Sequence, residues 1–319
     1  MSAMLITGAN GFVGNALAIR LTADGHPLRL ALRARLAALP VGVETFVHGD
    51  LGEEIDWTPA LVGVDAVLHC AARVHVMADT TDDPLAEFRR CNVDGTLRLA
   101  CAAAAARVRR FIFVSSIKVN GESTLPGLPF TAQQSPAPID PYGVSKWEAE
   151  QQLRKLSAET GMEVVIIRPV LVYGPGVKAN FLNMMKWLYK GAPLPLGAIH
   201  NKRSLVALDN LVDLIVTCIA HPQAANQTFL VSDGEDLSTT ELLRRMSHML
   251  GKRPHLLPVP AWMLETAAKL LGKQSVAQRL CGSLQVDISY TRERLGWTPP
   301  VSVDAALRKT AQHFLEQQK

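Results

Sequence analysis

A tyrosine and a lysine four residues apart, Tyr142 and Lys146, have the types and the spacing that proton transfer requires. On a helix this spacing places both side chains on one face. A free tyrosine has a pKa near 10, and a neighbouring ammonium favours the phenolate and lowers that pKa toward the working range. Two hydroxyls, Ser115 and Ser116, end a predicted strand about 26 residues earlier, where one of them can hold a substrate oxygen. The sequence therefore predicts a Ser–Tyr–Lys site.

A polar residue in a predicted long helix, Asn92, could fix a water molecule near Lys146. An ordinary helix residue is the other interpretation of Asn92, and the pattern leaves the two open.

A glycine-rich turn follows the first predicted strand, in the segment Thr7-Gly8-Ala9-Asn10-Gly11-Phe12-Val13-Gly14. Gly8 permits a tight turn, Gly11 lets a phosphate approach the backbone, and Gly14 lets the next helix pack close to the sheet. The N-terminus of that helix supplies N–H donors and positive potential for a pyrophosphate. A purely structural turn is the alternative, but the position between a strand and a helix favours dinucleotide binding.

The second predicted strand ends in arginines. An acidic residue there would bind the adenosine 2′-hydroxyl of NAD, whereas an arginine can accommodate the 2′-phosphate of NADP. Arg33 has Arg35 close by, and no Asp or Glu lies between Gly25 and Leu39. We therefore expect NADP(H) as the favoured cofactor and NAD(H) as the other candidate; two solvated surface arginines are the alternative. Asp50, just after the third predicted strand, is placed to meet the adenine.

Residues 1–170 alternate short β-rich runs with helical patterns. Several runs are continuously apolar, which fits strands buried on both faces of a parallel sheet. The predicted strands are Met4–Thr7, Leu28–Leu32, Thr45–His48, Ala66–Cys70, Phe111–Val114 and Val164–Arg168. The predicted helices of this part are Val13–Ala23, Pro84–Arg107 and Tyr142–Thr160. The alternation predicts an α/β fold with a doubly wound parallel (Rossmann) sheet.

After Pro169 this alternation ends and helical patterns dominate. They cover Asp209–Ala220, Thr239–Leu250, Ala261–Leu271 and Ser302–Gln317, with one strand predicted at Phe229–Ser232. We expect a dinucleotide-binding domain over residues 1–170, to which later strands near 204–232 return. Residues 171–319 then form mainly a smaller, mostly helical substrate-binding lobe.

Composition excludes several other classes of protein. Charged residues make up only 19% of the chain, which argues against disorder. The basic residues are scattered apart from Arg107, Arg109 and Arg110, so no nucleic-acid partner is expected. No run of about 18 uncharged apolar residues exists, so no membrane partner is expected. Five cysteines without C-x-x-C spacing favour buried, reduced thiols in a cytoplasmic protein, and no metal site is predicted.

Together these residues resemble the extended short-chain dehydrogenase/reductase family, of the NAD-dependent epimerase/dehydratase type. The motif T-G-x-x-G-x-x-G occurs at Thr7–Gly14. Further motifs follow in family order: His69-Cys70-Ala71-Ala72, Asn92-Val93-x-Gly95-Thr96, Val114-Ser115-Ser116, Tyr142-Gly143-Val144-Ser145-Lys146 and Arg168-Pro169. The resemblance covers nearly the whole chain. Within the family the chain looks most like bacterial UDP-sugar 4-epimerases and the 4-ketoreductases of surface-polysaccharide biosynthesis.

The likeness to reductases acting on UDP-4-keto-6-deoxy-N-acetylglucosamine is carried by three segments: Ser115–Glu122, Tyr173–Gly176 and Asn180-Phe181. The resemblance implies that Ser116 rather than Ser115 is the catalytic hydroxyl, beside Tyr142 and Lys146. It also implies a homodimer through the helices Pro84–Arg107 and Tyr142–Thr160.

With the resemblance added, the expected cofactor contacts are Gly8, Asn10, Gly11, Phe12, Val13, Gly14, Arg33, Asp50, Leu51, Ala71, Ala72, Asn92, Tyr142, Lys146 and Pro169. A UDP-sugar substrate would contact Ser116, Asn180, Arg203 and Arg279 by the same resemblance. Arginine suits the diphosphate through bidentate, charge-assisted hydrogen bonds.

Two positions depart from the family's patterns. Dehydratases place an Asp-Glu pair directly after the catalytic hydroxyl, where this chain has Ile117 and Lys118. Epimerases commonly carry an Asn three residues after the arginine of the sixth strand, where this chain has Leu171. Dehydration is therefore not expected, and the resemblance assigns no substrate contact to Leu171.

The favoured function is NADPH-dependent reduction of a sugar 4-ketone, in which Tyr142 donates a proton, Ser116 orients the carbonyl oxygen and Lys146 tunes Tyr142. The alternative is a UDP-sugar 4-epimerase with NAD held tightly, which oxidises C4, rotates the keto intermediate and reduces its other face. A non-catalytic dinucleotide sensor is the second alternative.

Overall fold

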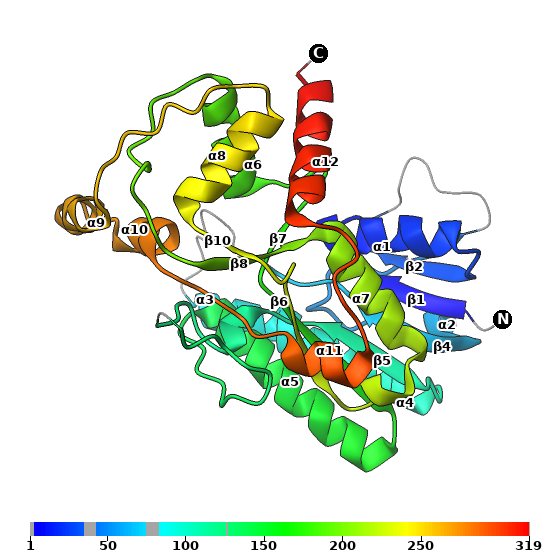
Figure 1. Cartoon of the computed structure of the whole chain (residues 1–319). Coiled ribbons are helices and arrows are strands. Elements are labelled where there is room, and N and C mark those ends of the chain that lie inside the picture. The colour runs from blue at the N-terminus through cyan, green and yellow to red at the C-terminus, as the bar shows by residue number, and fades with distance from the viewer. Residues whose placement is uncertain (1–2, 35–42, 75–82, 126, 319) are drawn as a thin grey trace.

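The computed structural model of the chain describes residues 3–34, 43–74, 83–125 and 127–318 (Figure 1). Its larger sheet has seven parallel strands in the order β3-β2-β1-β4-β5-β6-β9. These strands are β1 (Ala3–Thr7), β2 (Leu28–Leu32), β3 (Glu44–Val47), β4 (Val64–His69), β5 (Arg110–Val114), β6 (Glu163–Pro169) and β9 (Thr228–Val231). The predicted doubly wound sheet is confirmed. Its order reverses between β1 and β4, the place where such sheets bind ligands at their carboxyl ends.

Helices cover both faces of this sheet. On one face, α1 (Phe12–Ala23) packs beside α7 (Leu208–Ala220), and Leu17, Leu21 and Leu214 belong to one apolar core. On the other face, α4 (Gly95–Ala105) and α5 (Pro141–Thr160) contribute Leu99 and Leu153 to a second core. This double covering explains why the strand runs are continuously apolar.

The predicted helix Pro84–Arg107 is interrupted, which corrects the expectation of one continuous element. It consists of α3 (Pro84–Arg89), a π-helical turn (Arg90–Asp94) and α4. At the end of the turn Gly95 approaches the chain after β3 so closely that a Cβ would lie 2.5 Å from the Leu51 carbonyl oxygen. Such turns are frequent at functional sites, and this one carries Asn92.

A smaller lobe is built on a second sheet of three strands in the order β10-β8-β7. They are β7 (Leu171–Tyr173), β8 (Arg203–Ala207) and β10 (Asp236–Leu237). The helices of this half are α6 (Ala179–Tyr189), α8 (Thr239–Met249), α9 (Ala261–Leu270), α10 (Gln274–Cys281), α11 (Ser289–Leu295) and α12 (Val303–Glu316). α6, α8 and α12 share a core that includes Phe181, Leu243 and Leu307.

Of the later strands, β9 lies beside β6 at the edge of the larger sheet, whereas β8 pairs with β7 and β10. Strand β8, at residues 203–207, therefore does not return to the larger sheet as expected. The division of the chain near residue 170 stays a prediction.

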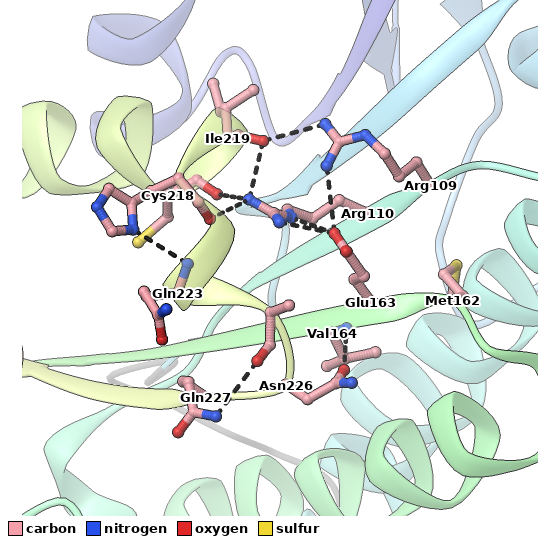
Figure 2. Close-up of polar contacts among 12 residues, drawn as sticks. Arg109, Arg110, Met162, Glu163, Val164, Cys218, Ile219, Gln223, Asn226 and Gln227 are labelled. Carbon is pink, nitrogen blue, oxygen red and sulfur yellow. Dashed lines mark hydrogen bonds and ion pairs between the residues drawn. The ribbon is translucent and has the colours of Figure 1, made fainter. Parts of the chain in front are cut away.

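The cluster of arginines before and within β5 closes the end of α7 (Figure 2). Arg110 is 1% exposed, and its Nη1 donates to the carbonyl oxygens of Cys218 (2.7 Å), Ile219 (3.1 Å) and His221 (2.9 Å). Glu163 accepts from Arg110 Nε at 2.7 Å and from Arg109 at 3.2 Å. The last carbonyl groups of a helix have no hydrogen-bond donor within the helix. At the end of α7 the buried guanidinium of Arg110 is that donor. Arg110 thus has a structural role.

All five cysteines are free. Cys91 and Cys218 are buried, but Cys101 is exposed, which corrects the expectation of buried thiols for that residue. Within the described ranges, no helix has both the length and the apolar character to cross a bilayer.

Candidate active site

The glycine turn brings the end of β1 against both α1 and the chain after β4. Gly8 has φ +70°, and a Cβ on it would lie 2.7 Å from the backbone nitrogen of Ala71. A Cβ on Gly14 would lie 2.2 Å from the carbonyl oxygen of Gly8. Gly11 begins α1 without a side-chain cap, so the first N–H groups of the helix face outward to a ligand. This geometry fits the pyrophosphate of a dinucleotide.

The other residues of the turn differ in exposure. Asn10 is exposed, while Phe12 and Val13 are half-buried. Phe12 packs against the core shared by α1 and α7 and also against the core of the smaller lobe. Through Phe12 the glycine turn therefore packs against both the core of the larger sheet and the core of the smaller lobe.

A buried polar link lies under this turn. Thr7 Oγ1 lies 2.7 Å from His69 Nδ1, and His69 Nε2 lies 2.9 Å from Thr96 Oγ1. The backbone nitrogen of Ala71 donates to Thr7 Oγ1 at 3.3 Å. Burial lowers the pKa of His69 to about 3, so the ring is neutral. The link fixes the half-buried Ala71 and Ala72 beside Gly8.

Asn92, 2% exposed, holds the same segment from its other side. Its Oδ1 accepts from the backbone nitrogen of Arg73 at 2.8 Å. Its Nδ2 donates to the carbonyl oxygen of Arg73 at 3.0 Å and to Ser145 Oγ at 3.1 Å. The amide therefore joins the chain after β4 to α5 rather than contacting Lys146 directly. The binding of a water molecule near Lys146 by Asn92 stays a prediction.

Ser116, Tyr142 and Lys146 come together at the carboxyl end of β5. Ser116 begins a short 3₁₀ turn (Ile117–Val119), and Asp140 caps α5 by accepting from Gly143 N at 2.7 Å. Tyr142, in the first turn of α5, hydrogen-bonds Ser116. Lys146, one turn further and 1% exposed, donates to the carbonyl oxygen of Val114 at 2.9 Å. Its Nζ also lies 4.3 Å from the ring centre of Phe113.

The environment of Tyr142 keeps its hydroxyl protonated. Burial raises the pKa of Tyr142, the charge of Asp140 adds to this, and the hydrogen bond with Ser116 opposes both. Burial lowers the pKa of Lys146 to about 8, against the opposing charges of Cys70 and Glu150. That Lys146 lowers the pKa of Tyr142 stays a prediction; its ammonium donates to the backbone carbonyl of Val114. Tyr142 is suited to donate a proton, and needs further positive charge to accept one.

A buried ionic network behind this site was not predicted. Glu150, fully buried one turn after Lys146, accepts from Arg168 Nε at 2.9 Å and Nη2 at 2.5 Å. It also accepts from Ser115 Oγ at 2.6 Å, and Arg168 Nη1 donates to Asn120 Oδ1 at 2.9 Å. The network ties α5 to the ends of β5 and β6. Ser115 is thus occupied in it, which leaves Ser116 as the hydroxyl at Tyr142.

The residues expected around the adenosine lie at the ends of β2 and β3. Arg33 is exposed at the end of β2, and Arg35 lies outside the described residues. Asp50 Oδ1 accepts from Gly52 N at 2.8 Å and from Arg90 at 3.1 Å. Burial would raise the pKa of Asp50, but these donors outweigh it and hold the pKa low. An ionised Asp50 next to a buried Leu51 is compatible with the expected contact.

Pro169 and the expected substrate residues lie further along the chain. Pro169 is buried at the end of β6. Asn180 is exposed at the start of α6, and Arg203 on β8 donates to the Gly282 carbonyl oxygen at 3.0 Å. Arg279 is exposed on α10 and donates to the Ser275 carbonyl oxygen at 3.0 Å. That these three residues contact one substrate stays a prediction.

The position that dehydratases use for acid–base chemistry has another role in this chain. Ile117 is 5% exposed, and Lys118 forms ion pairs with Asp140 and, at 3.3 Å, with Glu122. Sequence reasoning missed Asp140, although an Asp before Pro141 is a typical helix cap. In the part of the chain that is described, no group of three or more His, Cys, Asp or Glu could hold a metal ion.

A doubly wound sheet with a glycine turn, and a Ser–Tyr–Lys site at the end of its fifth strand, defines an enzyme of the extended short-chain dehydrogenase type. Residues 4–232 match the NAD dependent epimerase/dehydratase family, and the chain belongs to this family.

Relatives and solved structures agree with this assignment. The chain is 50% identical over 314 residues to a UDP-glucose 4-epimerase of Vibrio cholerae, covering 98% of this chain and 95% of the relative. It is 28% identical to the N-acetyl-alpha-D-glucosaminyl-diphospho-ditrans,octacis-undecaprenol 4-epimerase of Escherichia coli O157:H7, over 97% of this chain and 94% of that one.

Among solved structures, the UDP-glucose 4-epimerase of Thermotoga maritima with UDP-glucose has TM-score 0.80 and 21% identity, over 99% of this chain and 100% of its own. The UDP-glucuronic acid 4-epimerase of Bacillus cereus in complex with NAD has TM-score 0.81 and 19% identity, with the same coverage. These two likenesses show the fold.

Proposed function

We propose that this chain is a UDP-hexose 4-epimerase that uses NAD. The observation that carries the proposal is the 50% identity, over 98% of the chain, to a UDP-glucose 4-epimerase. The preferred expectation, a 4-keto reductase, has no such support, and its epimerase alternative is favoured instead. The glycine turn, the uncapped start of α1 and the buried Lys146 fit a bound dinucleotide.

The residues of the site would act on the sugar C4 hydroxyl. NAD, when bound, supplies the capacity to take up and return a hydride. As a phenolate, favoured by the positive charge of the nicotinamide when NAD is bound, Tyr142 Oη would accept the proton of the C4 hydroxyl and later return it, and Ser116 Oγ would orient that oxygen through a hydrogen bond. Lys146 would contact the nicotinamide ribose and fix it against α5. Gly8, Gly11 and Gly14 would hold the pyrophosphate, and Arg203 with Asn180 the diphosphate of the substrate.

A direct assay tests this proposal. The protein, purified without added nucleotide, is denatured to identify what it releases, and the native protein is incubated with UDP-galactose. We expect released NAD and conversion to UDP-glucose with no net change in reduced nucleotide. Consumption of NADPH with a UDP-4-keto-6-deoxy-hexosamine, without epimerisation, would establish the reductase instead. Nucleotide binding with no turnover of either substrate would favour the non-catalytic dinucleotide sensor.

The exposed Arg33 favours the NADP(H)-dependent reductase as a second candidate, because a guanidinium there can meet a 2′-phosphate. We expect Arg33→Ala to weaken NADPH binding by about fivefold and to leave NADH binding unchanged, since one exposed charge pair contributes about 1 kcal/mol. Isothermal titration of the emptied protein with each nucleotide measures both affinities. An unchanged NADPH affinity would make Arg33 a solvated surface charge.

We also propose that the chain acts in the cytoplasm in surface-polysaccharide biosynthesis, as a homodimer through the helical segments 84–105 and 141–160. The dimer is proposed from the family resemblance; α4 and α5 lie side by side on one face of the sheet, where they could form a common surface for a second chain. Sedimentation equilibrium would contradict it by finding a monomer.

A further inference from the structure

The hairpin formed by α9 and α10 lies at the margin of the molecule, away from the larger sheet (Figure 1). No residue of α9 is buried, and Ala277 is the buried residue of α10. Ala261 and Leu264 pack only partly against the core of the smaller lobe. A helix in a globular protein normally buries an apolar stripe. α9 therefore has an outer surface that the described parts of the chain do not cover.

This outer surface is apolar on one face. Successive helical residues are about 100° apart, so Trp262, Thr266 and Leu270 lie on one line, with Met263 beside them. Trp262 is 66%, Met263 46% and Leu270 83% exposed. Leu271, in the turn between the helices, is 71% exposed. Such a concentration of large exposed apolar side chains is typical of an interaction surface.

Basic residues predominate on the same hairpin. Lys269, Lys273 and Arg279 are exposed on the hairpin, against a single acidic residue, Glu265. A helix with an apolar face rich in Trp and Leu and a flank of Lys or Arg has the composition of an interfacial membrane helix. The three cations also add attraction to anionic lipid headgroups.

We propose that the α9–α10 hairpin binds the surface of an anionic lipid bilayer, with Trp262, Met263, Leu270 and Leu271 in the headgroup region. A second copy of the chain fits less well, because a two-fold contact would bring two sets of the same three cations into one interface. The expectation of no membrane partner was based on the absence of a spanning segment, which this surface does not require. The proposal is independent of the proposed function.

The position of the hairpin gives this contact a consequence for the substrate lobe. α10 ends at Cys281, and the next residue, Gly282, accepts the hydrogen bond from Arg203. A bilayer bound by the hairpin would therefore lie close to the side chain expected to hold the substrate diphosphate.

Co-sedimentation of the full chain with vesicles tests the proposal. Vesicles of phosphatidylcholine with about one-third phosphatidylglycerol are compared with vesicles of phosphatidylcholine alone. We expect binding to the anionic vesicles, weaker by on the order of tenfold or more in Leu270→Glu/Leu271→Glu, because both exposed side chains leave the apolar region. Lys269→Gln/Lys273→Gln should lower the affinity roughly fivefold for each lysine removed, and added salt should reduce this difference.

Val62→Glu is the matched control, because Val62 is 67% exposed and precedes β4, far from the hairpin in sequence. It should bind anionic vesicles as the parent does. Thermal unfolding checks that all variants fold. Absence of vesicle binding by the parent, or unchanged binding by Leu270→Glu/Leu271→Glu, would overturn the proposal. A parent dimer that this variant converts to monomer would also overturn it, in favour of a second copy.

Discussion

Replacing Tyr142 by phenylalanine is expected to lower the epimerisation rate by roughly 10²- to 10⁴-fold, the range that a positioned acid–base group contributes. The substitution removes the hydroxyl that hydrogen-bonds Ser116 and keeps the ring that lies 6.0 Å from Phe88. The folded structure and the cofactor site should therefore persist. Conversion of UDP-galactose under saturating substrate measures the effect.

The control is cofactor binding by the same variant. NAD retained on purification should equal that of the parent, because Gly8, Gly14 and Lys146 are unchanged. Activity within threefold or so of the parent would remove Tyr142 from the mechanism. Loss of bound NAD together with activity would instead assign Tyr142 to cofactor binding.

Replacing Glu150 by glutamine is expected to destabilise the protein by about 3 kcal/mol or more, as for other broken buried ion pairs. The substitution keeps the volume of the side chain but leaves the guanidinium of Arg168, itself 1% exposed, without its counter-charge. It also weakens the acceptor of Ser115. Urea unfolding followed by circular dichroism gives the free energy of unfolding.

Glu148→Gln provides the comparison on the same helix. Glu148 pairs with Arg89 at 2.6 Å, but both side chains are partly exposed, at 28% and 48%. An exposed pair contributes about 0–1 kcal/mol, so the free energy of unfolding of this variant should be close to that of the parent. If the two variants lose equal stability, the buried network contributes no more than a surface pair.

The sequence alone predicted the larger sheet and the residues at its carboxyl edge. This was achievable because strands covered on both faces are continuously apolar, so each run and its end could be read along the chain. The ends of β1, β4 and β5 then place Gly8, Ala71 and Ser116 near one another. The helix predicted at Thr239–Leu250 corresponds likewise to α8, which Ser238 caps by accepting from Glu241 N at 3.0 Å.

Contacts between distant segments could not be predicted in this way. The π-helical turn at Asn92 ends where Gly95 closely approaches Leu51, a contact that no local pattern records. The pairing of Arg168 with Glu150 and the bond from Lys146 to Val114 depend on the finished sheet. The short helices α6 and α10 were missed among neighbouring Gly and Pro residues, where the periodic signal is brief.

The cap of α7 by Arg110 bears on how the chain is made in the cell. A ribosome synthesises the strands β1 to β6 before it makes the carbonyl groups of residues 218–221 that Arg110 binds. Until then Nη1 of Arg110, on the inner strand β5, must stay hydrated or lack its carbonyl partners, although Nε can already pair with Glu163 of β6. The nascent sheet therefore completes its packing late in translation, after α7 has emerged.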